Sequence, residues 1–186
     1  MFKKTTLILA FALAFGGCAS YNAFDMFKKD EGYEKALLNT KNAQLSNSFE
    51  TKIKLTATYL NPLFPQTYKD AEYFFVGVFI PQDYDDSNKA GLFNKDYNLT
   101  IKTKEIKEST LGAPLKPAQY LPAVKIEEIV KKDESELYKK MPHVDNWSRY
   151  YVVSFPKQEG NEAVTLKLQS AIFGESLVVF PRVGLE

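Results

Sequence analysis

Residues 73–80, Tyr-Phe-Phe-Val-Gly-Val-Phe-Ile, form an apolar run that no charged side chain interrupts. Pro81 follows directly, and proline ends a strand because it has no backbone N–H to donate to a neighbouring strand. A short apolar run rich in aromatic and β-branched residues is typical of a strand covered on both faces. We therefore expect residues 73–80 to form the strand at the centre of the hydrophobic core.

The segment before this run alternates between apolar and polar side chains. Over residues 49–59 the apolar positions fall on one face of an extended chain, and the other face carries lysines and threonines. Such alternation predicts a strand with one buried face. The apolar positions are Ile53, Leu55, Ala57 and Tyr59.

Five further segments have the composition and the bounding turn residues of strands. They are residues 97–103, 121–130, 149–155, 163–169 and 176–180. A short turn around Phe173-Gly174-Glu175 joins the last two. The resulting count of about seven strands predicts a mainly β domain in which two antiparallel sheets pack face to face.

Two helices are expected beside these strands. The first covers residues 30–42, with Asp30 as its cap and a helical recurrence at Tyr33, Leu37 and Thr40. The second is a short insertion that begins with Asp133 as cap and runs through Leu137 and Tyr138 to Met141. Pro142 ends it, because the residue before a proline avoids the helical conformation.

The N-terminus has the pattern of an export signal. Lys3 and Lys4 precede an apolar run over residues 7–15, which is too short for the roughly 20 apolar residues that a membrane-spanning helix needs. The sequence Phe15-Gly16-Gly17-Cys18 follows this run. We therefore interpret residues 1–17 as a signal peptide and leave them out of the fold.

Phe15-Gly16-Gly17-Cys18 resembles the lipobox of bacterial lipoproteins, although Phe15 stands where leucine is usual. The resemblance implies that the Cys18 thiol receives a diacylglycerol, that cleavage precedes Cys18, and that the new amino group is acylated. Several acyl chains are needed, since a single chain anchors a protein only marginally. The alternative interpretation is an ordinary signal peptide that is cut after Ser20.

This interpretation divides the chain into a signal peptide (1–17), a lipidated tether (18–29) and one domain (30–186). Ala19 and Ser20 follow the cysteine, and by resemblance to lipoprotein sorting in Gram-negative bacteria the absence of aspartate there implies an outer-membrane location. The strand order and the lipobox together resemble immunoglobulin-like β-sandwich lipoproteins of these bacteria. The cysteine pair and buried tryptophan of antibody domains are absent, so the resemblance implies a variant sandwich with an added helix.

Composition narrows the classes of partner and cofactor. The 24 basic and 23 acidic residues nearly balance, which removes the electrostatic argument for nucleic acid. Cys18 is the single cysteine and His143 the single histidine, so neither an internal disulfide nor a Cys/His zinc cluster can form within the chain. We expect no cofactor.

Asp83, Asp85 and Asp86 gather carboxylates in the loop after the central strand, as a calcium ion requires. The segment lacks the glycine and the bidentate glutamate of an EF-hand, and a solvated turn is the alternative interpretation.

His143, two residues from Asp145, could suggest a catalytic triad. Because no nucleophile elbow is present, we interpret His143 as an ordinary loop residue.

Asn98 lies in Asp96-Tyr97-Asn98-Leu99-Thr100, which matches the extended glycosylation acceptor of some bacterial oligosaccharyltransferases. The alternative is a plain asparagine where a strand begins.

No set of catalytic residues emerges, so we expect a non-enzymatic envelope module that binds the bilayer through acylated Cys18 and contacts another envelope or surface protein. The rival hypotheses are an adhesin-like lipoprotein that binds carbohydrate or another ligand, and a hydrolase of envelope polymers.

Overall fold

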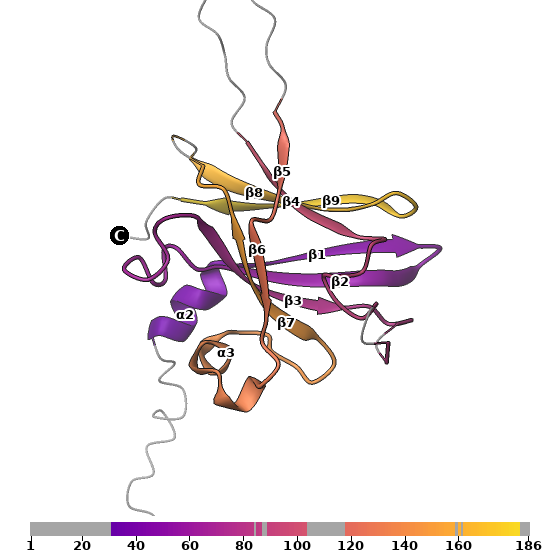
Figure 1. Cartoon of the computed structure of the whole chain (residues 1–186), viewed down its shortest axis with the longest axis horizontal. Coiled ribbons are helices and arrows are strands. Elements are labelled where there is room, and N and C mark those ends of the chain that lie inside the picture. Colours follow the sequence, from indigo (N-terminus) through magenta and orange to yellow (C-terminus); the bar gives the residue numbers. More distant parts are fainter. Residues whose placement is uncertain are drawn as a thin grey trace, which may run out of the picture. The chain divides into compact units, whose positions relative to one another are not determined.

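The fold is a mainly β sandwich of two antiparallel sheets (Figure 1), as the sequence predicted. The computed structural model describes residues 31–83, 85–86, 89–103, 118–158, 160 and 162–182. The compact unit begins at Gly32. The strands in the described part are β1 (Thr40–Asn47), β2 (Glu50–Tyr59), β3 (Glu72–Phe79), β4 (Asn98–Lys102), β5 (Tyr120–Pro122), β6 (Lys125–Glu128), β7 (Arg149–Phe155), β8 (Ala163–Ser170) and β9 (Gly174–Pro181).

One sheet has the strand order β1-β2-β3-β7-β6, and the other has the order β5-β4-β8-β9. Every pairing is antiparallel. Strands β1 to β3 follow one another within the first sheet. The chain then crosses to the second sheet for β4 and β5, returns for β6 and β7, and crosses again for the β8–β9 hairpin.

Strand β3 lies at the centre of the five-stranded sheet and is covered on both faces, as its uninterrupted apolar sequence predicted. Phe74, Val76 and Val78 point into the main core between the sheets. Phe75 points the other way, into a second apolar cluster with Tyr150 of β7. Each face of the strand therefore has an apolar layer to pack against, which explains why it carries so few polar residues.

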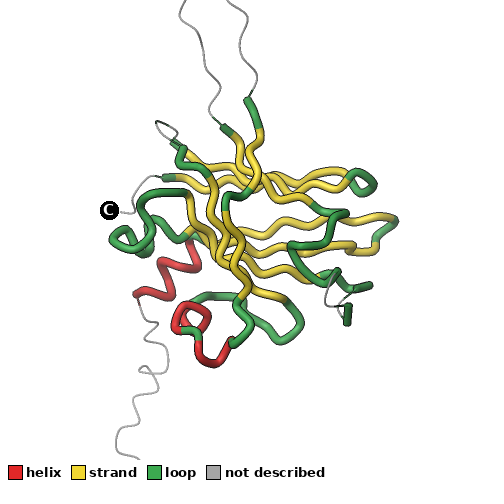
Figure 2. Tube along the Cα trace, viewed as in Figure 1, coloured by secondary structure: helices red, strands yellow, loops and turns green. Residues whose placement is uncertain are grey.

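The second cluster lies beneath two helices, α2 (Glu31–Leu38) and α3 (Glu136–Lys140). Figure 2 shows both helices on the same side of the five-stranded sheet. Ala36 of α2 packs there with Leu60 and Met141. Gly77 faces this layer as well, because a Cβ atom at that position would lie 2.7 Å from Cε1 of Tyr150. The tyrosine ring thus covers the glycine in the neighbouring strand.

The predicted helix over residues 30–42 is too long at its C-terminal end. The helix stops at Leu38, and residues 40–47 form strand β1 along the edge of the sheet. Thr40 Oγ1 donates to the Ala36 carbonyl at 2.6 Å and lies 2.7 Å from Thr58 Oγ1, so it links the helix end to β2. Asp30, the predicted cap, lies outside the described residues.

The prediction of one strand over residues 121–130 is also wrong in detail. The segment forms β5 in one sheet and β6 in the other, and Ala123 and Val124 make the bend between them. Strands that bend in this way close the corner of a sandwich. The described residues therefore contain nine strands, two more than predicted.

The short inserted helix is present, but it has a different cap. Asp133 lies in a 3-10 turn, η2 (Lys132–Glu134), and the cap of α3 is Ser135, whose Oγ accepts a hydrogen bond from the Tyr138 amide at 3.2 Å. The helix ends at Lys140 before Met141 and Pro142. The helix end set by proline is confirmed.

A buried polar network closes one end of the sandwich. Glu72, at the start of β3, accepts hydrogen bonds from the Tyr59 hydroxyl at 2.6 Å and from the Gln158 amide at 2.8 Å. It also forms an ion pair with Arg182, which follows β9. Burial raises the pKa of Tyr59 well above its usual value, and its hydrogen bond to the Glu72 carboxylate raises it further.

Candidate functional site

Three connections meet at one end of the sandwich: the β1–β2 turn, the β3–β4 loop and the β8–β9 turn. Gln82 of the β3–β4 loop donates a hydrogen bond to Glu50 beside the β1–β2 turn at 3.2 Å. The Lys52 ammonium lies 5.9 Å from the ring centroid of Phe173 in the β8–β9 turn. Phe173 also stacks on Tyr97, with ring centroids 6.3 Å apart. Side-chain contacts therefore join the three connections at this end of the sandwich.

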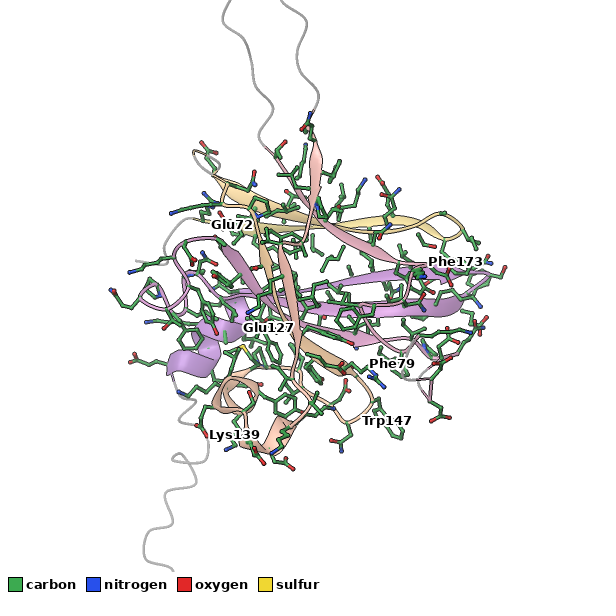
Figure 3. The ribbon with its side chains drawn as sticks, in the orientation of Figure 1. Glu72, Phe79, Glu127, Lys139, Trp147 and Phe173 are labelled. Atoms are coloured by element: carbon green, nitrogen blue, oxygen red, sulfur yellow. The ribbon has the colours of Figure 1, made fainter. Side chains whose placement is uncertain are left out.

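The loop that leads into β7 reaches the same end. Arg149, the first residue of β7, pairs with Val78 near the end of β3, so Trp147 lies close to the point where β3 stops. Figure 3 shows Trp147, Phe79 and Phe173 on the same side of the domain, with Glu72 far from them. Four connections thus form this end of the sandwich.

Each of these four connections carries a large apolar side chain that is mostly exposed. The exposed fraction is 109% for Phe49, 58% for Phe93, 67% for Trp147 and 74% for Ile172. We call these four residues the loop-end surface. Single exposed apolar residues are common, but several gathered on neighbouring loops are typical of an interaction site.

Phe49 is held in a backbone conformation that is unfavourable for phenylalanine. Ser48 and Phe49 form the two-residue β1–β2 turn, with φ values of 49° and 68°. Such turns favour Asn-Gly, because glycine alone adopts positive φ without steric cost. A fully exposed phenylalanine gains no packing at this position to offset the strain. The residue therefore does not serve the stability of the fold.

The loop that carries Phe93 is held against the core by Tyr151 of β7. The Phe93 ring meets the Tyr151 ring edge-on, with centroids 5.8 Å apart. Gly91 allows this approach, because a Cβ atom there would lie 1.8 Å from the Tyr151 hydroxyl. The Asn94 side chain donates to the Lys89 carbonyl and accepts from the Asp96 amide, each at 2.9 Å. The exposed ring therefore sits on a well-ordered loop.

A cation positions the Trp147 loop. The Lys132 ammonium donates to the Ser148 carbonyl at 2.9 Å and lies 5.0 Å from the centroid of the Tyr150 ring and 5.9 Å from that of Tyr138. The Asp145 carboxylate accepts from the amides of Trp147 and Ser148, at 2.9 and 2.6 Å. These contacts fix the backbone on both sides of the tryptophan.

The β3–β4 loop brings an excess of acidic residues to the loop-end surface. Residues 80–97 contain four aspartates, namely Asp83, Asp85, Asp86 and Asp96, against Lys89 and Lys95. Burial raises the pKa of Tyr97, and the carboxylates of Asp96 and Asp83 raise it further. An excess of carboxylates on this loop would favour a basic group on a partner.

The chain enters the folded unit at the opposite end. Helix α2 leads into β1 at Thr40, and β1 then extends over eight residues to the turn that carries Phe49. At about 3.3 Å per residue, the strand separates its two ends by roughly 23 Å. Figure 1 shows α2 on the left and the β1–β2 and β8–β9 turns on the right. The loop-end surface therefore faces away from the N-terminal connection.

The residues predicted from sequence do not gather into one site. Cys18 lies outside the described residues. Asn98 is exposed at the start of β4, whereas Thr100 of the same motif is paired with strands on both sides. His143 is exposed with a φ of 57°, and its neighbour Asp145 is engaged in the turn described above.

The predicted cation loop mainly forms tight turns. The Asp86 amide donates to the Asp83 carbonyl at 3.0 Å, and the Asp86 carbonyl accepts from the Ala90 amide at 2.8 Å. The Asp86 carboxylate lies 3.9 Å from the Lys89 ammonium. Within the described ranges, no three side chains of histidine, cysteine, aspartate or glutamate gather closely enough to hold a metal ion. Among the same residues no helix is long and apolar enough to cross a membrane.

No protein-family model, curated protein or solved structure matches the chain. The structure itself defines the class of protein: an antiparallel β-sandwich with two helices over one sheet and exposed apolar residues at one end.

Sequence reasoning missed the loop-end surface. Phe49 was included in a predicted strand, while Phe93 and Ile172 lie in segments without a distinctive pattern. The one available signal was the turn composition: Ser48-Phe49 stands where a two-residue hairpin favours Asn-Gly. That signal becomes visible only when β1 has been recognised as the partner of β2.

Proposed function

We propose that the chain is a lipid-anchored, non-catalytic protein-interaction module of the bacterial envelope, tethered to the outer membrane through Cys18. Its contact surface is the loop-end surface. The observation that carries this proposal is Phe49, which is fully exposed and held at positive φ on a turn at the opposite end of β1 from the chain's N-terminal connection. A strained, exposed aromatic residue on a rigid loop indicates a role in binding.

The partner is a protein whose apolar patch has a basic rim. Phe49, Phe93, Trp147 and Ile172 supply an apolar centre, and aromatic residues are enriched at the centre of protein interfaces. The excess of aspartates over lysines in residues 80–97 supplies an acidic edge. Because anionic bilayers repel acidic surfaces, this edge favours a protein over an anionic lipid surface.

The test is affinity capture with the full chain, expressed in its own host and solubilised in mild detergent. We expect a partner that co-purifies with the wild-type chain and is lost from the Phe49→Gly and Ile172→Ser variants. Higher salt should weaken the complex, because complementary charges are screened. Leu38→Ser is the matched control, since Leu38 has an exposed fraction of 58% at the opposite end, on α2.

Phe49→Gly separates binding from folding, because its two effects have opposite signs. Relief of the positive φ should raise the free energy of unfolding by about 1 kcal/mol. Capture should fall at least about tenfold, as expected for loss of a central aromatic contact. A partner retained equally by Phe49→Gly, Ile172→Ser and the Leu38→Ser control would refute the loop-end surface as the contact site.

A further inference from the structure

A pocket of about 160 Å³ opens between the turn that follows β2 and helix α3, on the side of the five-stranded sheet away from the core. The turn contributes Phe64, Thr67 and Tyr68, and the helix contributes Glu136, Leu137 and Lys140. The loop-end surface shares none of these residues. The pocket is thus a separate feature of the domain.

Hydrogen bonds and packing preform the pocket. The amides of Phe64 and Tyr68 donate to the carbonyls four residues earlier, each at 2.9 Å, so the segment forms two successive hydrogen-bonded turns. The two rings meet edge-on, with centroids 6.1 Å apart. Phe64, Tyr68 and Leu137 also pack against the buried cluster beneath the helices. These contacts fix the positions of Phe64, Tyr68 and Leu137 in the pocket wall.

The volume and the lining together define the ligand. A cavity of about 150 Å³ holds one six-membered ring. The walls are apolar at Phe64 and Leu137, whereas Thr67, Glu136 and Lys140 bring a hydroxyl, a carboxylate and an ammonium group to the rim. A hydrocarbon ring would use only the apolar walls, because it forms no hydrogen bonds with the groups at the rim. A pyranose ring has an apolar face of C–H groups that packs on aromatic rings, and a rim of hydroxyls that both donate and accept hydrogen bonds.

We propose that this pocket binds one pyranose unit of a carbohydrate. The sugar lies against Phe64 and Tyr68, its hydroxyls donate to Glu136, and they accept from Thr67 or Lys140. This inference goes beyond the protein contact proposed above and does not depend on it.

The rim of the pocket carries both signs of charge, because Glu136 and Lys140 both line it. The Glu136 carboxylate lies 2.8 Å from the Lys139 ammonium. The hydrogen bond to Lys139 lowers the pKa of Glu136, and the charges of Lys139 and Lys140 act in the same direction. The carboxylate therefore stays ionised at neutral pH, where it accepts hydrogen bonds from hydroxyls.

The experiment is saturation-transfer NMR on the full chain in detergent, with the methyl α-glycosides of glucose, mannose and galactose and with N-acetylglucosamine as probes. A single small site gives weak binding, with a Kd of about 1 mM. We expect at least one of the probes to receive saturation from the wild-type chain.

Thr67→Trp is the test variant, because Thr67 is an exposed pocket residue and the added ring fills the pocket without removing a core contact. Gln66→Trp is the matched control, since Gln66 is the exposed neighbour in the same turn and does not line the pocket. Thr67→Trp should abolish saturation of the sugar, and Gln66→Trp should preserve it. Glu136→Lys tests the rim and should weaken binding at least about tenfold.

Three results would overturn the proposal. The first is that none of the probe sugars receives saturation from the wild-type chain. The second is that a sugar binds equally to Thr67→Trp and Gln66→Trp. The third is that indole or phenol receives saturation from the wild-type chain but not from Thr67→Trp, while no pyranoside receives saturation. That result would make the pocket a site for an aromatic side chain.

Discussion

Glu72 and Arg182 lie 110 residues apart in the chain and form an ion pair that joins the two sheets. The Glu72 side chain is only 2% exposed, while Arg182 is 25% exposed. A buried carboxylate requires a partner, because its removal from water costs several kcal/mol. The pair therefore links the start of β3 to the end of β9 at the end of the sandwich opposite the loop-end surface.

Replacement of Arg182 should destabilise the fold through Glu72. Arg182→Met leaves the carboxylate with the Tyr59 hydroxyl and the Gln158 amide as its remaining donors. We expect the free energy of unfolding to fall by about 3 kcal/mol, measured by urea denaturation at neutral pH. The control is Lys125→Met, which removes an exposed ion pair with Glu127 and should cost less than about 0.5 kcal/mol. Equal effects of the two substitutions would show that Glu72 does not depend on Arg182.

The stability should decrease in alkaline solution because of Tyr59. Its pKa is raised in the folded state, whereas in the unfolded chain it is near 10, so the folded state retains the proton at a pH where the unfolded state loses it. The contribution is complete below about pH 10 and is lost as the pH rises further toward the folded-state pKa. Urea midpoints between about pH 9 and pH 11 measure this decline.

Tyr59→Phe tests that assignment. The variant should be less stable than the wild type at neutral pH, because Glu72 loses a donor at 2.6 Å. Its stability should then fall less steeply above about pH 10. The same slope in both proteins would assign the alkaline transition to the other tyrosines whose pKa burial raises, such as Tyr151.

Gly91 should tolerate no larger residue. In Gly91→Ala the new Cβ atom meets the Tyr151 hydroxyl at 1.8 Å and Cζ at 2.9 Å, so the ring or the loop must move. Overpacking of this kind costs about 1–3 kcal/mol in thermal or urea unfolding. Tyr151→Phe in the same chain removes the closest atom and should restore part of the loss. Gly174→Ala is the control with open space, where only its φ of 84° is unfavourable.

Cys18→Ser tests the proposed anchor. The serine hydroxyl does not replace the thiol in lipid transfer, so the variant should keep residues 1–17 and carry no acyl chains. Mass spectrometry of the N-terminus measures both properties, and fractionation with detergent-free washing measures membrane retention. A variant that is cut after Ser20 and fractionates like the wild type would favour the ordinary signal peptide.

The sequence was most informative where the pattern of burial was strong. The uninterrupted run at residues 73–80 and the alternation at residues 49–59 predicted β3 and β2 to within one residue at each end. The segment 149–155 was predicted with the bounds of β7. In these strands neighbouring side chains face distinct environments, so the hydrophobic periodicity is clear.

The elements that were predicted wrongly have weak hydrophobic patterns or patterns that fit more than one structure. Strand β1 has only Ala43 and Leu45 buried, because it is an edge strand, and its polar residues were assigned to a helix and a loop. Residues 121–130 contain two short strands, and a local pattern does not reveal that Ala123 and Val124 carry the chain from one sheet to the other. Both interaction sites proposed above combine residues distant in sequence, which no local pattern brings together.

The position of α2 at one end and of Phe49 at the other has a mechanical consequence. A load applied between the first helix and a partner held at the far turns would run lengthwise along β1. Force that reaches Phe49 would be carried by the covalent backbone of β1, and force passed on to the other loops would load the β1–β2 hydrogen bonds together in shear, so they would not open one after another. The geometry suits a connector that stays folded under tension.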